Sequence, residues 1–277
     1  MRAIVHHEHG DPAHVLRVEE VAVPNVNEDE VRIRVANVAI HPGDLLGVMG
    51  SPAFGAPPPI GVAGRIPGFE GSGVVSEVGR AVDPARGIEV GRRVAFFPAS
   101  SAWADEVVVA ATSVVPLPDD VPDEIGAQIL INTISALSVV RAVETAFPAI
   151  DVGDDTVLQT AAGSAVGRLV AALLVERGVS VIRLVRTEAG AGALAARVPG
   201  GRVLATEASD WKARVREILG GKPQSRMEPT DHEILAAQEA CGGERFSGAN
   251  LKNYPRRGMI ARAVDASHVA IDSCIDE

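Results

Sequence analysis

Aromatic and sulfur-containing residues are scarce in this sequence. Only 3% of its 277 residues are Phe, Trp or Tyr, and the two cysteines are Cys241 and Cys274. Two cysteines that lie far apart, both late in the chain, exclude a disulfide framework and a CxxC zinc site. Such usage fits a reducing compartment, so we expect a cytoplasmic protein.

The sequence also lacks a basic stripe and a long apolar run. Its formal net charge is −10 at pH 7, which argues against a nucleic acid as partner. No apolar run approaches the roughly 20 residues that span a bilayer, and the N-terminus has no apolar core of a secretory signal. We therefore expect neither nucleic acid nor membrane as a partner.

What the sequence does contain is enough apolar material for two domains, since 47% of the residues are hydrophobic. Residues 1–120 hold short segments rich in Val and Ile, separated by Gly, Pro, Asp and Asn, which is typical of β-strands. Residues 50–68 are too rich in Pro and Gly for a regular element. They predict a long loop, either a lid over a site or a plain surface excursion.

The pattern changes near residue 120. Acidic residues and Pro122 precede apolar positions at helical spacing, which predicts a helix over residues 123–145. Three apolar strands then alternate with three helices up to residue 221, a pattern typical of a parallel sheet. The strands are DTVLQTA, VSVIRLVR and GRVLAT. We expect a first domain over residues 1–120 and a second over 121–221. Residues 222–277 stay unassigned, with one predicted helix near 231–240 and one candidate strand, HVAID.

The first of these strands leads into a turn of small residues, within VLQTAAGSAVGRLV at 157–170. Ser164 stands at an N-cap position, and the helix that follows offers free N–H groups and a favourable dipole to an anion. We expect a pyrophosphate to bind Ser164, Ala165, Val166 and Gly167, with Gly167 also allowing close helix packing. Ala161 and Ala162 stand where such turns usually have glycine. A β-α-β unit without a ligand is therefore an open alternative.

The second strand bears on which dinucleotide binds. Arg186 lies nineteen positions after Gly167, where units that bind NAD usually have an acidic residue. Glu188 comes two positions after Arg186. An arginine suits the 2′-phosphate of NADPH, which it can hold by charge-assisted hydrogen bonds. We expect NADPH rather than NADH; the alternative for Arg186 is a solvated strand end.

Residues 1–221 resemble a known family. The stretches that carry the likeness are MRAIVHHEHGDPAHVLRVEEV, ANVAIHPGDLLGVMG, IPGFEGSGVVSEVG, WADEVVV, INTISAL, QTAAGSAVGRLV and VIRLVR. They are similar to the zinc-independent branch of the medium-chain dehydrogenase/reductases, which includes quinone oxidoreductases and mitochondrial-type 2-enoyl reductases. The likeness implies an α/β protein: a GroES-like β-barrel domain followed by a Rossmann doubly wound parallel sheet. It also implies an oxidoreductase that passes hydride from NADPH to a small molecule, a quinone, an enone or a 2-enoyl thioester. Asn132 and Thr133 are expected to line the cleft near the nicotinamide.

Some residues depart from the family pattern. His41 and Phe69 stand where zinc-dependent relatives have metal ligands, and Phe69 cannot bind a metal, so we expect none. The HHEH cluster at residues 6–9 reads as a solvated strand end, since His6 would face away from His7 and His9. Enoyl reductases place a tyrosine where the nearest aromatic here is Phe54, and the only tyrosine is Tyr254. The family's tyrosine is therefore not matched, and we assign no catalytic acid or base. A quinone needs no such proton donor, because it takes protons from water, so this difference favours quinones as substrates.

The sequence after residue 221 does not match the second half of the family's sheet. The three-strand half is the part that binds the adenine side of the cofactor. One alternative is therefore a non-catalytic or degenerate relative that binds NADPH but has lost its catalytic half-site. Another is a two-domain fold without any nucleotide. A homodimer is left open.

Overall fold

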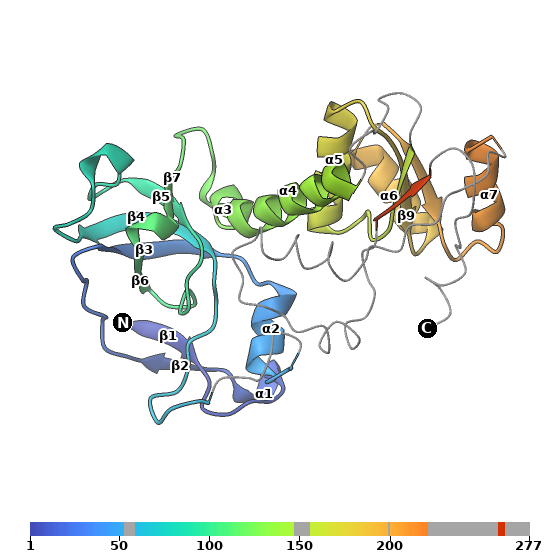
Figure 1. The fold of residues 1–277 in the computed structure, drawn as a ribbon. Coiled ribbons are helices and arrows are strands. Elements are labelled where there is room, and N and C mark those ends of the chain that lie inside the picture. The colour runs from blue at the N-terminus through green and yellow to red at the C-terminus, as the bar shows by residue number, and fades with distance from the viewer. Residues whose placement is uncertain (53–58, 147–155, 199, 221–259, 264–277) are drawn as a thin grey trace. The chain divides into compact units, whose positions relative to one another are not determined.

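The computed structural model describes residues 1–52, 59–146, 156–198, 200–220 and 260–263 (Figure 1). The chain divides into two compact units, with the boundary between Ile131 and Asn132. The predicted domain limits at residues 120 and 221 rest on the sequence and stay predictions.

Three of the expected features lie outside the described residues in whole or in part. Residues 53–58 of the predicted loop are outside them, as are the predicted helix near 231–240 and the candidate strand HVAID. Cys241, Cys274 and Tyr254 lie there too, so the inferences drawn from the two cysteines stay predictions.

The first unit is built on β-strands, as its segments rich in Val and Ile predict, and these strands pair in the antiparallel direction. The strands are β1 (Arg2–Val5), β2 (Arg17–Glu20), β3 (Glu30–Val38), β4 (Gly71–Val78), β5 (Arg93–Phe96), β6 (Glu106–Ala110) and β7 (Val114–Pro116). Five of them form one sheet in the order β6-β3-β4-β5-β7, and β1 pairs with β2. The sequence pattern did not indicate β7, which is three residues long.

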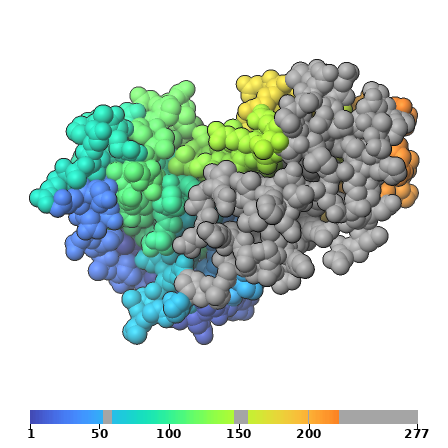
Figure 2. All heavy atoms as spheres, viewed as in Figure 1, coloured from blue at the N-terminus to red at the C-terminus, as the bar shows by residue number. Residues whose placement is uncertain are grey.

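Short helices connect these strands. They are α1 (Pro12–Val15), α2 (Pro42–Val48), η1 (Pro84–Arg86), η2 (Ala111–Ser113) and α3 (Asp123–Gly126). The core contains mostly Val and Ala, and its largest aromatic members are Phe96 and Trp103. Figure 2 shows the described residues of this unit as a closely packed body, from the blue atoms of the first strands to the green atoms of the last helices.

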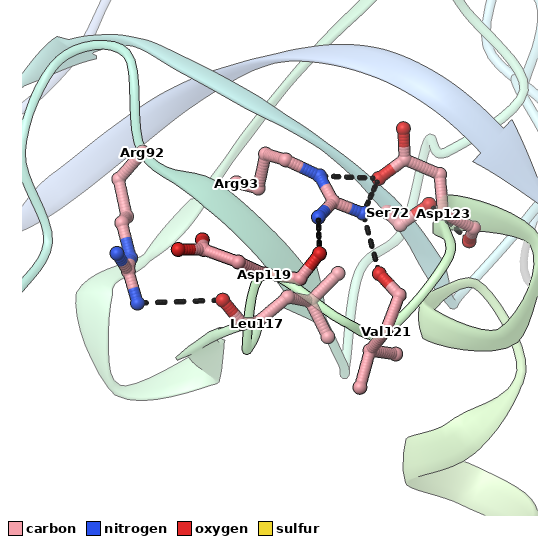
Figure 3. Close-up of polar contacts among 7 residues, drawn as sticks. All are labelled: Ser72, Arg92, Arg93, Leu117, Asp119, Val121 and Asp123. Atoms are coloured by element: carbon pink, nitrogen blue, oxygen red, sulfur yellow. Dashed lines mark hydrogen bonds and ion pairs between the residues drawn. The ribbon is translucent and has the colours of Figure 1, made fainter.

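An arginine on β5 attaches the segment that leads into α3 (Figure 3). The Arg93 guanidinium donates to the Asp123 carboxylate from Nε at 3.1 Å and from Nη2 at 2.8 Å. Nη2 also donates to the Val121 carbonyl at 2.6 Å. On β4, the Ser72 hydroxyl donates to the Asp123 carbonyl at 2.7 Å. These bonds place the start of α3 against the sheet of the first unit.

The single helix predicted over residues 123–145 is wrong, because the structure has two. The first, α3, ends at Gly126, and α4 (Ile129–Ala146) begins after a two-residue turn. The break has a specific cause. The N–H groups of Leu130 and Ile131 donate to the Glu70 carboxylate, at 2.7 and 3.0 Å, instead of continuing the ladder of α3. A carboxylate at the first turn of a helix satisfies its free donors and complements its dipole.

The second unit confirms the predicted alternation of strands and helices. Its elements after α4 are β8 (Thr156–Gln159), α5 (Ala165–Glu176), β9 (Ser180–Val185), α6 (Glu188–Arg197), β10 (Arg202–Ala205), α7 (Trp211–Ile218) and β11 (Ile260–Ala263). The sheet order is β10-β9-β8-β11. The strands β8, β9 and β10 are parallel, and β11 pairs with β8 in the antiparallel direction.

Apolar side chains cover this sheet on both faces. One cluster joins Val157 and Val181 of the strands to buried residues of α4 and α5, including Val140 and Val170. The other joins residues of β9 and β10 to α7, with Trp211 as its largest member. Alternate strand residues thus point to opposite layers, which is the arrangement expected of a doubly wound sheet.

One buried strand residue is charged. Arg183 on β9 is 2% exposed, and burial lowers the pKa of its guanidinium below the ordinary value. Its Nη1 donates to the Val198 carbonyl at 2.9 Å, and Nη2 donates to the Gly200 carbonyl. The arginine thereby holds the end of α6 and the turn before β10 against the middle of the sheet.

Candidate functional site

The predicted phosphate turn lies between β8 and α5. Ser164 is the N-cap of α5, and its Oγ accepts the Gly167 N–H at 3.0 Å. Ser164 and Ala165 are exposed, and Val166 is half-buried. Because the first N–H groups of a helix have no partner within the helix, this end of α5 presents donors at an accessible surface. A helix start of this kind is a general anion-binding arrangement in proteins.

Gly167 makes the close approach that its place in the sequence predicts. A Cβ built on Gly167 would lie 2.4 Å from the Ala161 carbonyl oxygen and 3.0 Å from the Ala162 Cα. Helix α5 therefore contacts the turn backbone directly. The chain reaches this arrangement with Ala161 at a φ of +50°, in the left-handed region where L residues are strained. The backbone thus adopts the conformation of a glycine turn although an alanine stands there.

Replacing Ala161 with glycine is expected to raise the free energy of unfolding of the second unit by about 0.5–1 kcal/mol. The left-handed conformation costs alanine about 1–2 kcal/mol, and the greater freedom of glycine in the unfolded chain offsets about 0.4–1 kcal/mol of that gain. Urea unfolding followed by Trp211 fluorescence in a Trp103→Phe background measures it. The control is Ala172→Gly, on the exposed face of α5, which should destabilise by about 0.5–1 kcal/mol. Destabilisation by both substitutions would contradict the strain at Ala161.

The structure brings Arg186 to the same edge of the sheet as this turn. The Ala162 N–H donates to the Leu184 carbonyl at 3.1 Å, which ties the turn to the end of β9. Arg186 follows β9 directly and is exposed, and Thr187 after it caps α6 by accepting the Gly190 N–H at 3.1 Å. The carboxyl ends of parallel strands meet at this edge, where doubly wound sheets bind their ligands.

Glu207 lies at this edge as well, and our sequence analysis did not single it out. It follows β10, and its N–H donates to the Arg186 carbonyl at 3.0 Å. Its Oε1 accepts the N–H of Glu188, the first residue of α6, at 2.7 Å. The only signal in the sequence was an acidic residue two positions after the third strand. That signal alone does not show that the residue lies beside Arg186.

Asn132 and Thr133 lie on α4 and are half-buried. Asn132 is the first residue of the second unit. Their expected place near a nicotinamide stays a prediction.

A second polar cluster, which we call the His41 cluster, lies in the first unit and consists of His41, Asp44 and Glu70. The His41 Nε2 and the Glu70 Oε2 are 2.8 Å apart, and Glu70 is 0% exposed. The Asp44 Oδ2 accepts the His41 N–H at 2.8 Å. Burial raises the pKa of the Asp44 carboxyl above its ordinary value, an effect that the His41 N–H and imidazole oppose. Since Glu70 also caps α4, the cluster connects α2 to the first turn of that helix.

Phe69 stacks on the His41 imidazole, with ring centroids 5.0 Å apart. It therefore presents to the His41 imidazole an apolar ring, which cannot bind a metal. Among the residues that the structure describes, no group of three or more His, Cys, Asp or Glu side chains is placed to hold a metal ion.

The HHEH cluster differs from its expected role as a solvated strand end. His6 is 1% exposed, and its backbone bridges to Arg65. The strand β1 ends at Val5, so strict alternation stops there and His6 turns inward after the buried Val5. His7 is exposed, as expected, and its Nε2 lies 2.9 Å from Glu19 Oε1. The prediction was therefore wrong for His6.

Among the helices that the structure describes, none has the length and apolar character needed to cross a bilayer.

Known proteins resemble the chain in both units. Residues 27–119 match the alcohol dehydrogenase GroES-like domain. The mitochondrial enoyl-[acyl-carrier-protein] reductase of Xenopus tropicalis is 29% identical over 229 residues, which cover 82% of this chain and 62% of that protein. The chain therefore spans less than two thirds of the length of this relative.

Solved structures show the same likeness. A candidate NADPH:quinone reductase from Bacillus thuringiensis is 29% identical with a TM-score of 0.66, over 85% of this chain and 69% of its own. A mycobacterial protein in complex with NADPH is 28% identical with a TM-score of 0.67, over 86% of this chain and 70% of its own. The predicted fold class, a GroES-like domain with a Rossmann-type parallel sheet, is confirmed. The predicted resemblance to the medium-chain dehydrogenase/reductases is therefore confirmed.

Proposed function

We propose that the protein is an NADPH-dependent oxidoreductase that reduces a small molecule, a quinone or an activated C=C such as an enone or a 2-enoyl thioester. The observation that carries the proposal is the edge of the parallel sheet. There the Ser164-capped start of α5 and the exposed Arg186 are joined by the bond from the Ala162 N–H to the Leu184 carbonyl. An anion-binding helix start beside a cationic strand end suits a dinucleotide that carries a 2′-phosphate.

The residues of the turn fit such a cofactor. Ala161 and Ala165 have small side chains, Gly163 has none, and all three residues are exposed. A Cβ built on Gly163 would meet nothing nearer than 3.6 Å. The backbone can therefore approach a pyrophosphate closely. In this proposal Ser164, Ala165, Val166 and Gly167 hold the pyrophosphate, and Arg186 holds the 2′-phosphate. Asn132 and Thr133 orient the nicotinamide end.

When bound, the nicotinamide would supply a hydride to the substrate. The chain's own contribution is to hold the cofactor in place, because hydride transfer requires the reacting atoms at about 3–3.5 Å. We propose that no metal takes part, since the His41 imidazole is engaged by Glu70 and stacked by Phe69. A quinone needs no dedicated proton donor, because it can take protons from water after hydride transfer.

A second candidate is a relative that binds NADPH without turnover. The observation that favours it is β11, which pairs with β8 in the antiparallel direction. A doubly wound sheet of strand order 3-2-1-4-5-6 has a parallel strand beside its first strand. The second half of that sheet usually holds the nicotinamide. An antiparallel strand in its place would therefore impair hydride transfer more than it would impair binding of the adenine end of the cofactor.

The test is a titration of the full chain with NADPH and with NADH, followed by turnover assays with quinones and 2-enoyl thioesters. Arg186→Ala is expected to weaken NADPH binding about tenfold to a hundredfold, because each charge-assisted bond contributes about 1.5–3 kcal/mol. NADH binding should change little. The matched control is Arg202→Ala, an exposed arginine at the opposite end of the strand β10.

The outcomes separate the two candidates. Tight NADPH binding with oxidation supports the reductase, and tight binding without oxidation supports the non-catalytic relative. If NADPH does not bind, or if Arg202→Ala weakens it as much as Arg186→Ala, the proposed role of this edge is wrong.

A further inference from the structure

The carboxylate of Glu207 occupies part of the edge that the proposed cofactor would use. Arg186 and Thr187 connect β9 to α6. Glu207 lies two residues after the end of β10, next to this connection. Two backbone bonds fix this arrangement: Thr206 N–H to the Val185 carbonyl at 2.8 Å, and Glu207 N–H to the Arg186 carbonyl at 3.0 Å. Glu207 is therefore a fixed neighbour of Arg186 and not a distant surface residue.

The side chain of Glu207 is also held. Its Oε1 accepts the Glu188 N–H at 2.7 Å, so a carboxylate lies at the positive end of the α6 dipole. The Thr187 hydroxyl accepts another first-turn donor, the Gly190 N–H. The two side chains thus use donors at the start of α6 that an incoming phosphate would otherwise meet.

Two other charged residues, Glu188 and Arg186, lie near Glu207 at the start of α6. The Glu188 carboxylate lies 3.7 Å from the Arg214 guanidinium of α7. Arg186 is exposed. A 2′-phosphate bound by Arg186 would add about two negative charges near the Glu207 carboxylate. Like charges near a protein surface repel one another, and the repulsion grows as their separation falls.

We propose that Glu207 is a specificity-determining residue whose carboxylate weakens binding of the 2′-phosphate and so limits the preference for NADPH over NADH. This inference rests on the proposed function. The sequence analysis expected only Arg186, after the second strand, to select the cofactor, whereas here Glu207, after the third strand, contributes as well. Arg186 attracts the 2′-phosphate, and Glu207 sets how large the resulting preference is. The ribose of NADH bears only hydroxyl groups there, so its affinity depends little on the charge of residue 207.

The experiment uses Glu207→Gln in the full chain. Glutamine keeps an oxygen that can accept the Glu188 N–H and removes only the charge. Calorimetric titrations with NADP⁺ and NAD⁺ measure affinity without turnover. The variant is expected to bind NADP⁺ about five- to tenfold more tightly than the wild type and NAD⁺ within about twofold. The gain should shrink at 0.5 M salt, since screening weakens the repulsion.

The matched control is Glu176→Gln, an exposed acid at the far end of α5. It should leave both affinities within about twofold, because residue 176 is distant from the turn. Thermal unfolding of each variant shows whether the fold is intact. If Glu207→Gln is unfolded, Glu207→Ala takes its place, with the same expected gain for NADP⁺.

The failures are distinguishable. If the wild type binds NADP⁺ and Glu207→Gln leaves the ratio of the two affinities unchanged, the inference is overturned and the proposed function stands. An equal gain from Glu176→Gln also overturns it, since the effect would then come from net charge alone. If neither nucleotide binds to any of these proteins, the proposed function and the inference fall together.

Discussion

Replacing Glu70 with alanine is expected to lower the free energy of unfolding of the first unit by about 3–5 kcal/mol. The side chain is 0% exposed. Its Oε1 accepts the N–H groups of Leu130 and Ile131, and its Oε2 lies 2.8 Å from the His41 Nε2. Each buried donor that loses its partner costs about 1–3 kcal/mol. A cavity adds to this cost because the site is closed to water.

The two tryptophans allow the two units to be followed separately. Trp103 belongs to the first unit and Trp211 to the second, and both are buried. Urea unfolding of the full chain in a Trp211→Phe background reports the first unit through Trp103. The matched control is Glu89→Ala, an exposed acid in the same unit, which should change the stability by no more than about 0.5 kcal/mol.

Glu70→Gln tests which part of the cost comes from charge. Its amide oxygen can still accept both helix donors, so we expect it to recover more than half of the loss. An effect of Glu70→Ala as small as that of Glu89→Ala would show that the cap of α4 does not stabilise the unit.

Replacing Gly167 with alanine is expected to destabilise the second unit by about 2–3 kcal/mol and to weaken NADPH binding. A Cβ at this position would lie 2.4 Å from the Ala161 carbonyl oxygen and 2.9 Å from the Ser164 Oγ. The first contact is with backbone, so α5 has to move away from the turn, and overpacking of this kind costs about 1–3 kcal/mol. The movement also displaces the N–H groups that would hold the pyrophosphate.

Gly192 provides a control of opposite sign. It lies in the middle of α6, is exposed, and a Cβ there would meet nothing within 4 Å. Gly192→Ala should therefore stabilise the unit by about 0.5–1 kcal/mol. Urea unfolding monitored through Trp211 compares the two variants. Stabilisation by both substitutions would mean that α5 does not pack on the turn as the structure has it.

The sequence was sufficient for the features that depend on local periodicity. Short segments rich in Val and Ile predicted the strands of the first unit, and the apolar face of α5 together with Ser164 predicted the start of that helix. The same reasoning placed Gly167 at a close contact, which the structure confirms. In each case neighbouring residues determine the outcome, so a single stretch of sequence carries the information.

The features that the sequence analysis missed depend on residues far apart in the chain. The helix predicted over 123–145 is divided because Glu70, sixty positions before Leu130, supplies acceptors for the first turn of α4. Glu207 reaches the start of α6 only because β10 lies beside β9. Arg183 is buried in a strand because its guanidinium finds carbonyl groups after α6. None of these partners lies within the window from which a helix or strand is predicted.

The conformation of Ala161 bears on how β-α-β units with this type of turn are recognised in genomes. A glycine fingerprint assumes that a left-handed turn needs glycine, yet here alanine holds a φ of +50°. The cost of about 1–2 kcal/mol is small beside the total stability of about 5–15 kcal/mol that folded proteins have. A mutation from glycine to alanine can therefore persist through evolution without loss of the fold. Searches that require every glycine will overlook chains of this kind, whereas a pattern of strand, small residues and a capped helix retains them.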